Sequence, residues 1–178
     1  MSLDNVRAGL NPPEEINVII EVPAGGAPVK YEMHKRSGAL LVDRILHTPM
    51  CYPANYGFIP HTMSEDGDPT VVLVVCQHEL VPGCIIRARP IGVLLMEDEA
   101  GMDEKLIAVP DTKTDPTYEG VKSYTDLPQL LLDQIRHFFE HYKDLESDKW
   151  VKVIGWEDAD VAMEKISEGI RRENEENS

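Results

Sequence analysis

Strand-like segments dominate the first two-thirds of the chain, and helical patterns occur only in its last third. Short apolar or alternating runs bounded by turn residues predict strands. They span residues 16–22, 29–34, 39–46, 70–75, 84–98, 104–109 and 149–155. The run 84–98 is interrupted near Pro90 and Gly92 and is expected to form one or two strands. Many short strands followed by late helices favour an α+β fold with a small closed or nearly closed barrel.

The first two strands are expected to pair as a hairpin. The turn sequence PAGGAP at 23–28 separates the strand 16–22 from 29–34, which alternates apolar and polar residues. Within this second strand Lys30 and Glu32 share one face. Charged residues are also ordinary on the solvated face of a half-buried strand, so this pair alone does not establish a site.

Two amphipathic helices are predicted. The first begins near Asp126, which with Gln129 has the spacing of a capping box, and Pro128 is tolerated in the first turn. Its apolar stripe is Leu127, Leu131, Ile135, Phe138 and Tyr142. The second helix covers about 158–172, and the polar tail from about residue 173 is expected to fray. We expect residues 1–178 to form one domain.

Composition excludes several classes of protein. The 178 residues are 42% apolar, which suffices for one core, and the 17 basic against 32 acidic residues give a net charge of −15. Such a surface repels phosphate backbones, so no nucleic-acid partner is expected. No apolar run reaches the roughly 18–20 residues of a membrane span, and the first residues lack the apolar segment of a signal peptide. The three cysteines have no metal-binding spacing, which indicates reduced thiols and a cytoplasmic protein.

An acidic turn at Asp66-Gly67-Asp68-Pro69 leads directly into the apolar strand 70–75. Asp, Gly and Pro are common turn residues, so a solvated loop is one interpretation. A site for a hard cation is the other. An EF-hand is excluded, because Val71 and Gln77 stand where its loop requires Gly and Glu.

A second acidic turn follows the strand 84–98. Its acidic residues are Glu97, Asp98, Glu99, Asp103 and Glu104. Concentrated carboxylates favour a counter-cation. Oxygen ligands without histidine or cysteine suit Mg²⁺ or Mn²⁺ rather than zinc.

Cationic and phenolic side chains are available to bind an anion beside these carboxylates. They are Lys30, Arg44, Lys105, Lys143, Tyr52, Tyr56 and Tyr142. Taken singly, each is as well explained by a surface ion pair or a core tyrosine. Together with a metal they would suit a phosphate-rich anion.

The motifs taken together closely resemble bacterial family I soluble inorganic pyrophosphatases. The resemblance covers about residues 4–172. It rests on IEVPAGGAPVKYE, ALLVDR, YPANYGFIP, EDGDP, MEDEAGMDEKLIAVP and HFFEHYKDLE, in this order. It implies a five-stranded OB-like β-barrel with flanking helices. It also implies Mg²⁺-dependent hydrolysis of inorganic diphosphate to two phosphates by a homohexamer built as a dimer of trimers.

The resemblance also implies a role for each matching residue. Asp68, which assists the attacking water, and Tyr56 are expected at the catalytic centre. Phosphate oxygens would be held by Lys30, Arg44, Tyr56, Lys105, Tyr142 and Lys143. The expected metal ligands are Asp66, Asp98 and Asp103, with Glu32 for a metal carried by the substrate. Supporting positions are Glu21, Tyr52 and Glu99. His137 and His141 lie on the helix that the family uses for subunit contacts, so they are expected to be interface or core residues and not catalysts.

One position departs from the family pattern. The acidic turn of the family ends in a metal-bridging aspartate, and here that position is Val71. Valine cannot coordinate a metal, although it extends the apolar strand without steric difficulty. We therefore expect the fold to persist and catalysis to be weakened. The alternatives are a nearly inactive oligomer that binds Mg²⁺ and diphosphate, and a nucleic-acid-binding barrel, which the negative charge disfavours.

Overall fold

The structure is a computed structural model that describes residues 3–178. Its strands are β1 (Ile16–Val22), β2 (Val29–Met33), β3 (Leu40–Ile45), β4 (Asn55–Phe58), β5 (Val71–Val74), β6 (Ile85–Asp98), β7 (Gly101–Pro110) and β8 (Val151–Asp158). The α-helices are α1 (Gln129–His141) and α2 (Ala159–Glu176). Short 3-10 helices are η1 (Leu3–Asn5), η2 (Pro116–Tyr118) and η3 (Tyr124–Asp126).

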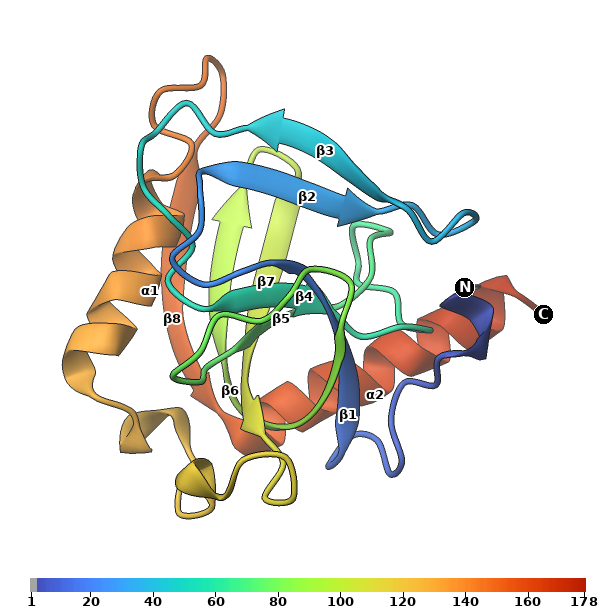
Figure 1. Ribbon diagram of the computed structural model, residues 1–178. Coiled ribbons are helices and arrows are strands. Elements are labelled where there is room, and N and C mark those ends of the chain that lie inside the picture. Colours follow the sequence, from blue (N-terminus) through green and yellow to red (C-terminus); the bar gives the residue numbers. More distant parts are fainter. Residues whose placement is uncertain (1–2) are drawn as a thin grey trace.

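Five strands close into a ring. The main sheet has the order β1-β4-β5-β7-β6-β8, and β1 also pairs with β6. The pairings are antiparallel except for β5 with β7, which run parallel. Strand β8 extends the sheet beyond β6, and α1 and α2 lie on different sides of the ring (Figure 1). This arrangement confirms the α+β fold with a small β-ring and flanking helices.

The ring strands bury side chains on both faces. In β5, Val72 and Val74 join a core cluster that includes Ala162 and Ile166 of α2. Leu73, between them, belongs to a second cluster that includes the apolar face of α1. Since successive side chains of a strand point to opposite faces, burial of both faces explains the continuous apolar run.

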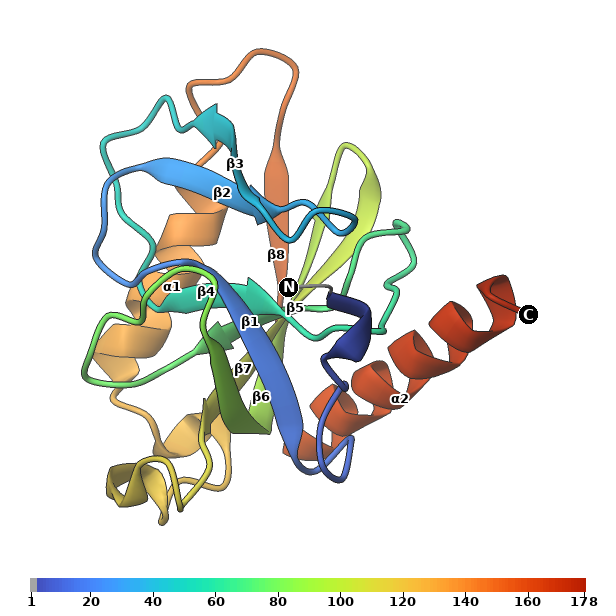
Figure 2. The ribbon, with the colours of Figure 1, turned by 45° about the vertical axis from the view of Figure 1, so that its right-hand side comes forward.

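The predicted hairpin between the first two strands was wrong. Strand β2 pairs instead with β3 in a separate two-stranded sheet. The two edges of β1 are already occupied by β4 and β6, so no edge is left for β2. Strand β2 is held to β1 by a side chain, because Glu21 Oε2 accepts a hydrogen bond of 2.7 Å from the Met33 N–H. The β2–β3 pair lies together at one end of the molecule (Figure 2).

The expected capping box of the first helix was also wrong. Helix α1 begins after Pro128, which makes no side-chain cap. Asp126 instead closes η3, where it forms a capping box with Ser123. The apolar stripe is confirmed with one shift, because Leu132 is buried while Leu131 is half-buried. The other buried residues of this stripe are Leu127, Ile135, Phe138, Phe139 and Tyr142.

Three further differences concern element boundaries. Residues 85–98 form one strand, in which a register shift between Pro90 and Gly92 absorbs the interruption. Strand β4 was not anticipated, since its four residues follow a Pro-containing turn and do not alternate. Helix α2 runs to Glu176, so fraying from residue 173 stays a prediction.

Within residues 3–178, no helix has the length and apolarity needed to cross a membrane.

Candidate active site

A polar cavity of about 370 Å³ lies beside the β2–β3 pair and the end of α1. Five segments contribute to its wall: β2–β3, β4, the acidic turn before β5, the β6–β7 turn with the start of β7, and the end of α1 with the following loop. Of the predicted site residues it contains Lys30, Arg44, Tyr52, Tyr56, Asp66, Asp68, Val71, Asp98, Glu99, Asp103, Lys105, Tyr142 and Lys143. The structure therefore brings together residues that lie more than a hundred positions apart in the chain.

Two lysines of the wall are buried and paired with carboxylates. Lys105 Nζ lies 3.1 Å from Asp103, and Lys143 Nζ lies 3.1 Å from Asp98 and 3.4 Å from Glu99. Their side chains are only 7% and 9% exposed. Burial alone would lower the pKa of Lys105, but Tyr56 and Asp103 outweigh it and raise the pKa well above the ordinary value. Both lysines are therefore fixed positive charges, and buried ammonium groups are rare unless paired.

Three tyrosines supply phenols next to these cations. Tyr52 and Tyr56 are buried, with ring centroids 5.0 Å apart, and Tyr142 is buried at the end of α1. Burial raises the pKa of Tyr52 and Tyr56, so both phenols stay protonated at neutral pH and can donate hydrogen bonds. Lys105 Nζ lies 5.7 Å from the centre of the Tyr56 ring, within the range of a cation–π contact.

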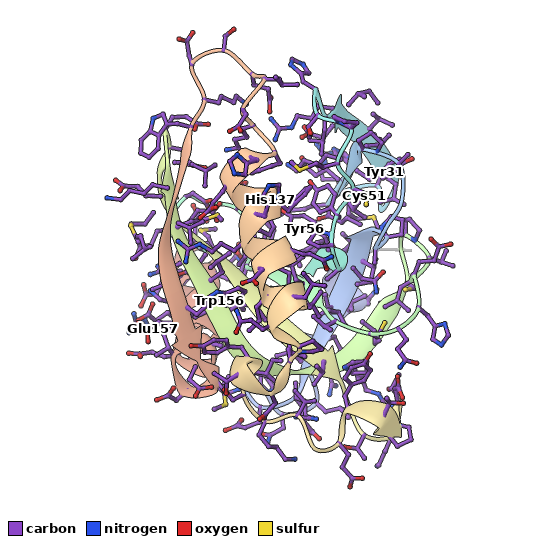
Figure 3. All side chains as sticks on the ribbon, turned by 90° about the vertical axis from the view of Figure 1, so that its left-hand side faces the viewer. Tyr31, Cys51, Tyr56, His137, Trp156 and Glu157 are labelled. Atoms are coloured by element: carbon purple, nitrogen blue, oxygen red, sulfur yellow. The ribbon has the colours of Figure 1, made fainter. Side chains whose placement is uncertain are left out.

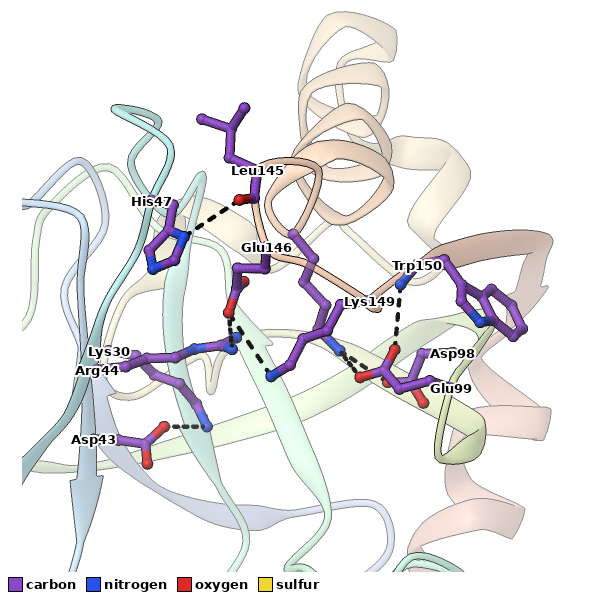
Figure 4. Close-up of polar contacts among 11 residues, drawn as sticks. Lys30, Asp43, Arg44, His47, Asp98, Glu99, Leu145, Glu146, Lys149 and Trp150 are labelled. Atoms are coloured by element: carbon purple, nitrogen blue, oxygen red, sulfur yellow. Dashed lines mark hydrogen bonds and ion pairs between the residues drawn. The ribbon is translucent and has the colours of Figure 1, made fainter.

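The remaining cations stand at the rim of the cavity on β2 and β3. Lys30 forms an ion pair of 3.2 Å with Asp43, and Arg44 forms one of 2.8 Å with Glu146 (Figure 4). Lys149 also lines the cavity and lies 3.7 Å from Glu146. Together with the buried lysines, these groups give an acidic protein a local cationic surface suited to an anion.

The carboxylates of the two acidic turns face the same cavity. Asp66 Oδ1 accepts the Asp68 N–H at 3.0 Å, which shapes the first turn. The pKa of Asp66 is raised, first by partial burial and then by the negative charges of Asp68 and Asp103. Burial would also raise the pKa of Asp98, but the Ala100 N–H and Lys143 outweigh it and hold the pKa below its ordinary value. Asp98 is therefore ionised. The ionised form of Asp66 would be stabilised by a nearby cation.

The donor set fits one particular mode of metal binding. Within residues 3–178, no three carboxylate, histidine or cysteine side chains converge as a group that could hold a metal ion. Among the described residues that line the cavity there is no histidine or cysteine, so the metal ligands they offer are oxygen atoms. Mg²⁺ is usually held by one or two carboxylates together with water and substrate phosphates, not by an all-protein cage. The residues present fit a cation that binds with an anionic substrate.

Two predicted residues lie outside this cavity. Glu21 and Glu32 line a neighbouring cavity of about 400 Å³, which shares Lys30, Tyr56, Asp68 and other wall residues with the first. Glu32 is exposed, whereas Glu21 is buried. Burial raises the pKa of Glu21 to about 7, despite the hydrogen bond from Met33 and the charge of Lys30. Glu32 is therefore accessible from solvent, whereas Glu21 is a structural link between β1 and β2.

Val71 stands at the wall that the two cavities share. It begins β5, opposite Phe58 in β4, and is half-buried against the core cluster that includes Tyr56. It lines both cavities. Asp66 and Asp68 line the first of these cavities as well, so the valine places an apolar surface among carboxylates.

Three polar residues of the rim were missed by the sequence reasoning. They are Asp43, Glu146 and Lys149. Asp43 had a local signal, because it precedes Arg44 in an otherwise apolar strand. Glu146 had none, since its partner Arg44 is about a hundred residues away in the chain, and Lys149 is linked to the rim through Glu146.

The histidines of α1 lie away from the cavity. His137 and His141 are exposed, with ring centroids 4.6 Å apart, so the expectation of core histidines is wrong. Figure 3, which looks onto α1, shows His137 on the outer side of the helix near Cys51. His137 lines a separate, mainly apolar groove together with Cys51 and Phe138.

The sequence is similar to those of known inorganic pyrophosphatases. A family model described as inorganic pyrophosphatase matches residues 18–174. An inorganic pyrophosphatase of Agrobacterium fabrum is 60% identical over 172 residues, covering 97% of both chains. That of Pseudomonas aeruginosa is 58% identical over 170 residues, covering 96% of this chain and 97% of its own.

Solved structures give the same result. A crystal structure of an inorganic phosphatase from Anaplasma phagocytophilum has a TM-score of 0.93 at 50% identity and covers 96% of this chain and 99% of its own. The inorganic pyrophosphatase of Thermus thermophilus has a TM-score of 0.91 at 41% identity, covering 98% of this chain and 99% of its own.

Proposed function

The chain belongs to the inorganic pyrophosphatase family and is an inorganic diphosphatase, and we propose that its reaction depends on Mg²⁺ and is weakened by Val71. The observation that carries this proposal is the single cavity whose wall combines acidic turns with paired, buried cations. Mn²⁺ or another hard divalent cation is an alternative, since the oxygen ligands do not discriminate strongly among them.

The wall residues divide into two functional groups. Carboxylates from Asp66, Asp98 and Asp103, one or two at a time, would hold the cation together with water and diphosphate oxygens, with Glu32 available from the neighbouring cavity. When bound, the cation would neutralise charge on the diphosphate oxygens and lower the pKa of a water molecule. The phosphate oxygens would be held by Lys30, Arg44, Lys105, Lys143, Tyr56 and Tyr142.

The chemical step consumes one water molecule. The water oxygen bonds to one phosphorus, and the bond from that phosphorus to the bridging oxygen breaks. Asp68 orients the water and accepts its proton, while the second phosphate leaves with the bridging oxygen. Lys105 and Lys143 offset the negative charge that grows on the leaving phosphate, and both are fixed before the reaction begins. Tyr56 donates to a phosphate oxygen, and Tyr52 and Glu99 support this arrangement.

Substitutions at Val71 distinguish two hypotheses. The chain is either a weakened enzyme or a nearly inactive protein that binds Mg²⁺ and diphosphate. We expect Val71→Asp to raise phosphate release from Mg²⁺ and diphosphate about 10- to 100-fold, because metal-assisted charge stabilisation contributes several kcal/mol. Val71→Asn is the matched control, since it has the same shape without the charge and should give little of the increase. Equal rates in the unaltered chain and Val71→Asp would show that the missing carboxylate is unimportant. Absence of phosphate release in all three would contradict the enzymatic proposal.

The assembly and location are part of the same proposal. We place the chain, as one domain, in the cytoplasm as a homohexamer built as a dimer of trimers. Three free cysteines and exposed apolar side chains such as Leu130 on α1 are consistent with this. Six chains of 20.0 kDa should give a molecular mass of about 120 kDa by sedimentation. A species of one chain at micromolar concentration would contradict the hexamer.

A further inference from the structure

The loop that follows α1 is attached to the cavity wall on two sides. Lys143, at its start, binds the β6–β7 turn through Asp98 and Glu99. At its end the Trp150 N–H donates to Glu99 at 3.4 Å. The middle of the loop contacts β3 through Glu146 (Figure 4). The loop therefore connects the β3 side of the cavity to the acidic β6–β7 turn.

Glu146 contacts two cations that line the cavity without lining it itself. Its Oε1 accepts a hydrogen bond of 2.8 Å from Arg44 Nη1 and lies 3.7 Å from Lys149 Nζ. Arg44 and Lys149 both face the cavity, whereas Glu146 is only 11% exposed and is not among the lining residues. One carboxylate oxygen therefore holds two rim cations from behind.

The Arg44–Glu146 pair leaves hydrogen-bonding capacity unused. Arg44 Nε and Glu146 Oε2 are both buried, and neither has a partner among the residues the structure describes. The guanidinium also lies 5.9 Å from the centre of the Tyr142 ring, so it is held between a carboxylate and an aromatic face. Arg44 is thus held from one side through Nη1, and a guanidinium has further N–H groups with which it can bind an incoming anion.

We propose that Glu146 is a positioning residue that holds Arg44 and Lys149 in the geometry that binds diphosphate. This inference rests on the proposed function, since it assigns a role at the same cavity. A negative charge behind an anion site opposes anion binding through Coulomb repulsion. Its presence there is explained if fixing two flexible cations contributes more to affinity than the repulsion removes.

Two interpretations of Glu146 predict opposite changes in affinity. If the residue acts only through its charge, removing the charge should strengthen anion binding. If it positions the cations, removing it should weaken binding, because Arg44 and Lys149 must then be ordered by the ligand itself. Glu146→Gln keeps the shape and one acceptor, whereas Glu146→Ala removes both.

The test measures binding of methylenediphosphonate, a diphosphate that cannot be hydrolysed, by calorimetry with excess Mg²⁺. We expect Glu146→Ala to weaken binding about tenfold, with Glu146→Gln between it and the unaltered chain. In an Arg44→Met background, Glu146→Gln should cause much less further loss, because its main partner is absent. Asp148→Asn removes a charge from the same loop, and Asn tolerates the positive φ of 63° there. This control should bind like the unaltered chain.

Each outcome decides the inference. Equal or tighter binding by both Glu146 variants would overturn it while leaving the proposed function intact. If Glu146→Ala does not fold, as judged by thermal unfolding without ligand, the isosteric Glu146→Gln decides alone. Failure of the unaltered chain to bind the phosphonate would overturn the proposed function and this inference together.

Discussion

The protonation states of individual side chains in and beside the cavity depend on burial as much as on neighbouring charges. Lys105 and Lys143 are positive although buried, because carboxylates lie within 3.1 Å of each. Glu21 is the opposite case, since it is buried, forms no ion pair within residues 3–178 and accepts a backbone hydrogen bond from Met33. Its pKa of about 7 follows from this isolation.

Glu21 should make the protein less stable as the pH rises. The folded protein holds the Glu21 proton up to a pKa of about 7, whereas the unfolded chain releases it near the ordinary value of 4.5. The stabilising contribution is therefore complete below about pH 4.5 and is lost as the pH passes through 7. Glu21→Gln can still accept the Met33 N–H and does not ionise. We expect it to exceed the unaltered chain in unfolding free energy by roughly 1–3 kcal/mol at pH 8 and by much less at pH 5.

Urea unfolding without metal or diphosphate at both pH values measures this difference. A Glu21→Gln variant that is destabilised equally at pH 5 and pH 8 would contradict the assignment. It would show that the carboxylate contributes only through its hydrogen bond to β2.

At the level of elements, local pattern predicted strands and helices better than their partners. The run at β5 was recognisable because both faces are buried. The pairing of β2 with β3 was not, because the neighbours of β1 are β4 and β6, which lie far along the chain. The Asp126 capping box failed for a local reason, since the same carboxylate caps η3 one turn earlier. Periodicity thus reports burial of a segment, while pairing depends on competition between segments.

Strand β4 depends on close packing against β1 at Gly57. A Cβ at this position would lie 2.1 Å from the Ile19 carbonyl oxygen. We expect Gly57→Ala to lower the unfolding free energy by about 2–3 kcal/mol, because backbone must move to relieve the clash. Gly155→Ala in β8 is the matched control, since within residues 3–178 the added carbon has no atom within 4 Å apart from those of Gly155 and its two chain neighbours. It should change stability by less than about 0.5 kcal/mol.

Urea unfolding midpoints of the two variants check this expectation. Equal stability of Gly57→Ala and Gly155→Ala would contradict the close approach of β1 and β4. Because Gly57 follows Tyr56, a displaced β4 should also weaken phosphonate binding.

At the scale of the whole molecule, the fold gathers charge of both signs at one place. The chain carries a net charge of −15, yet its cavity concentrates five cationic side chains: Lys30, Arg44, Lys105, Lys143 and Lys149. The motif residues could be predicted from the sequence through their resemblance to a family. Glu146 and Lys149 could not, because Glu146 meets Arg44, and places Lys149 beside it, only after the loop following α1 has folded against β3.

The central claim is that the two acidic turns hold a divalent cation together with diphosphate in this cavity. Anomalous diffraction from crystals grown with Mn²⁺ and methylenediphosphonate tests it most directly. The account predicts a Mn²⁺ peak within about 2.5 Å of carboxylate oxygens of Asp66 or Asp103 and of phosphonate oxygens, and a much weaker peak when the phosphonate is omitted. A Mn²⁺ ion bound elsewhere, or phosphonate bound away from Lys105 and Lys143, would contradict it.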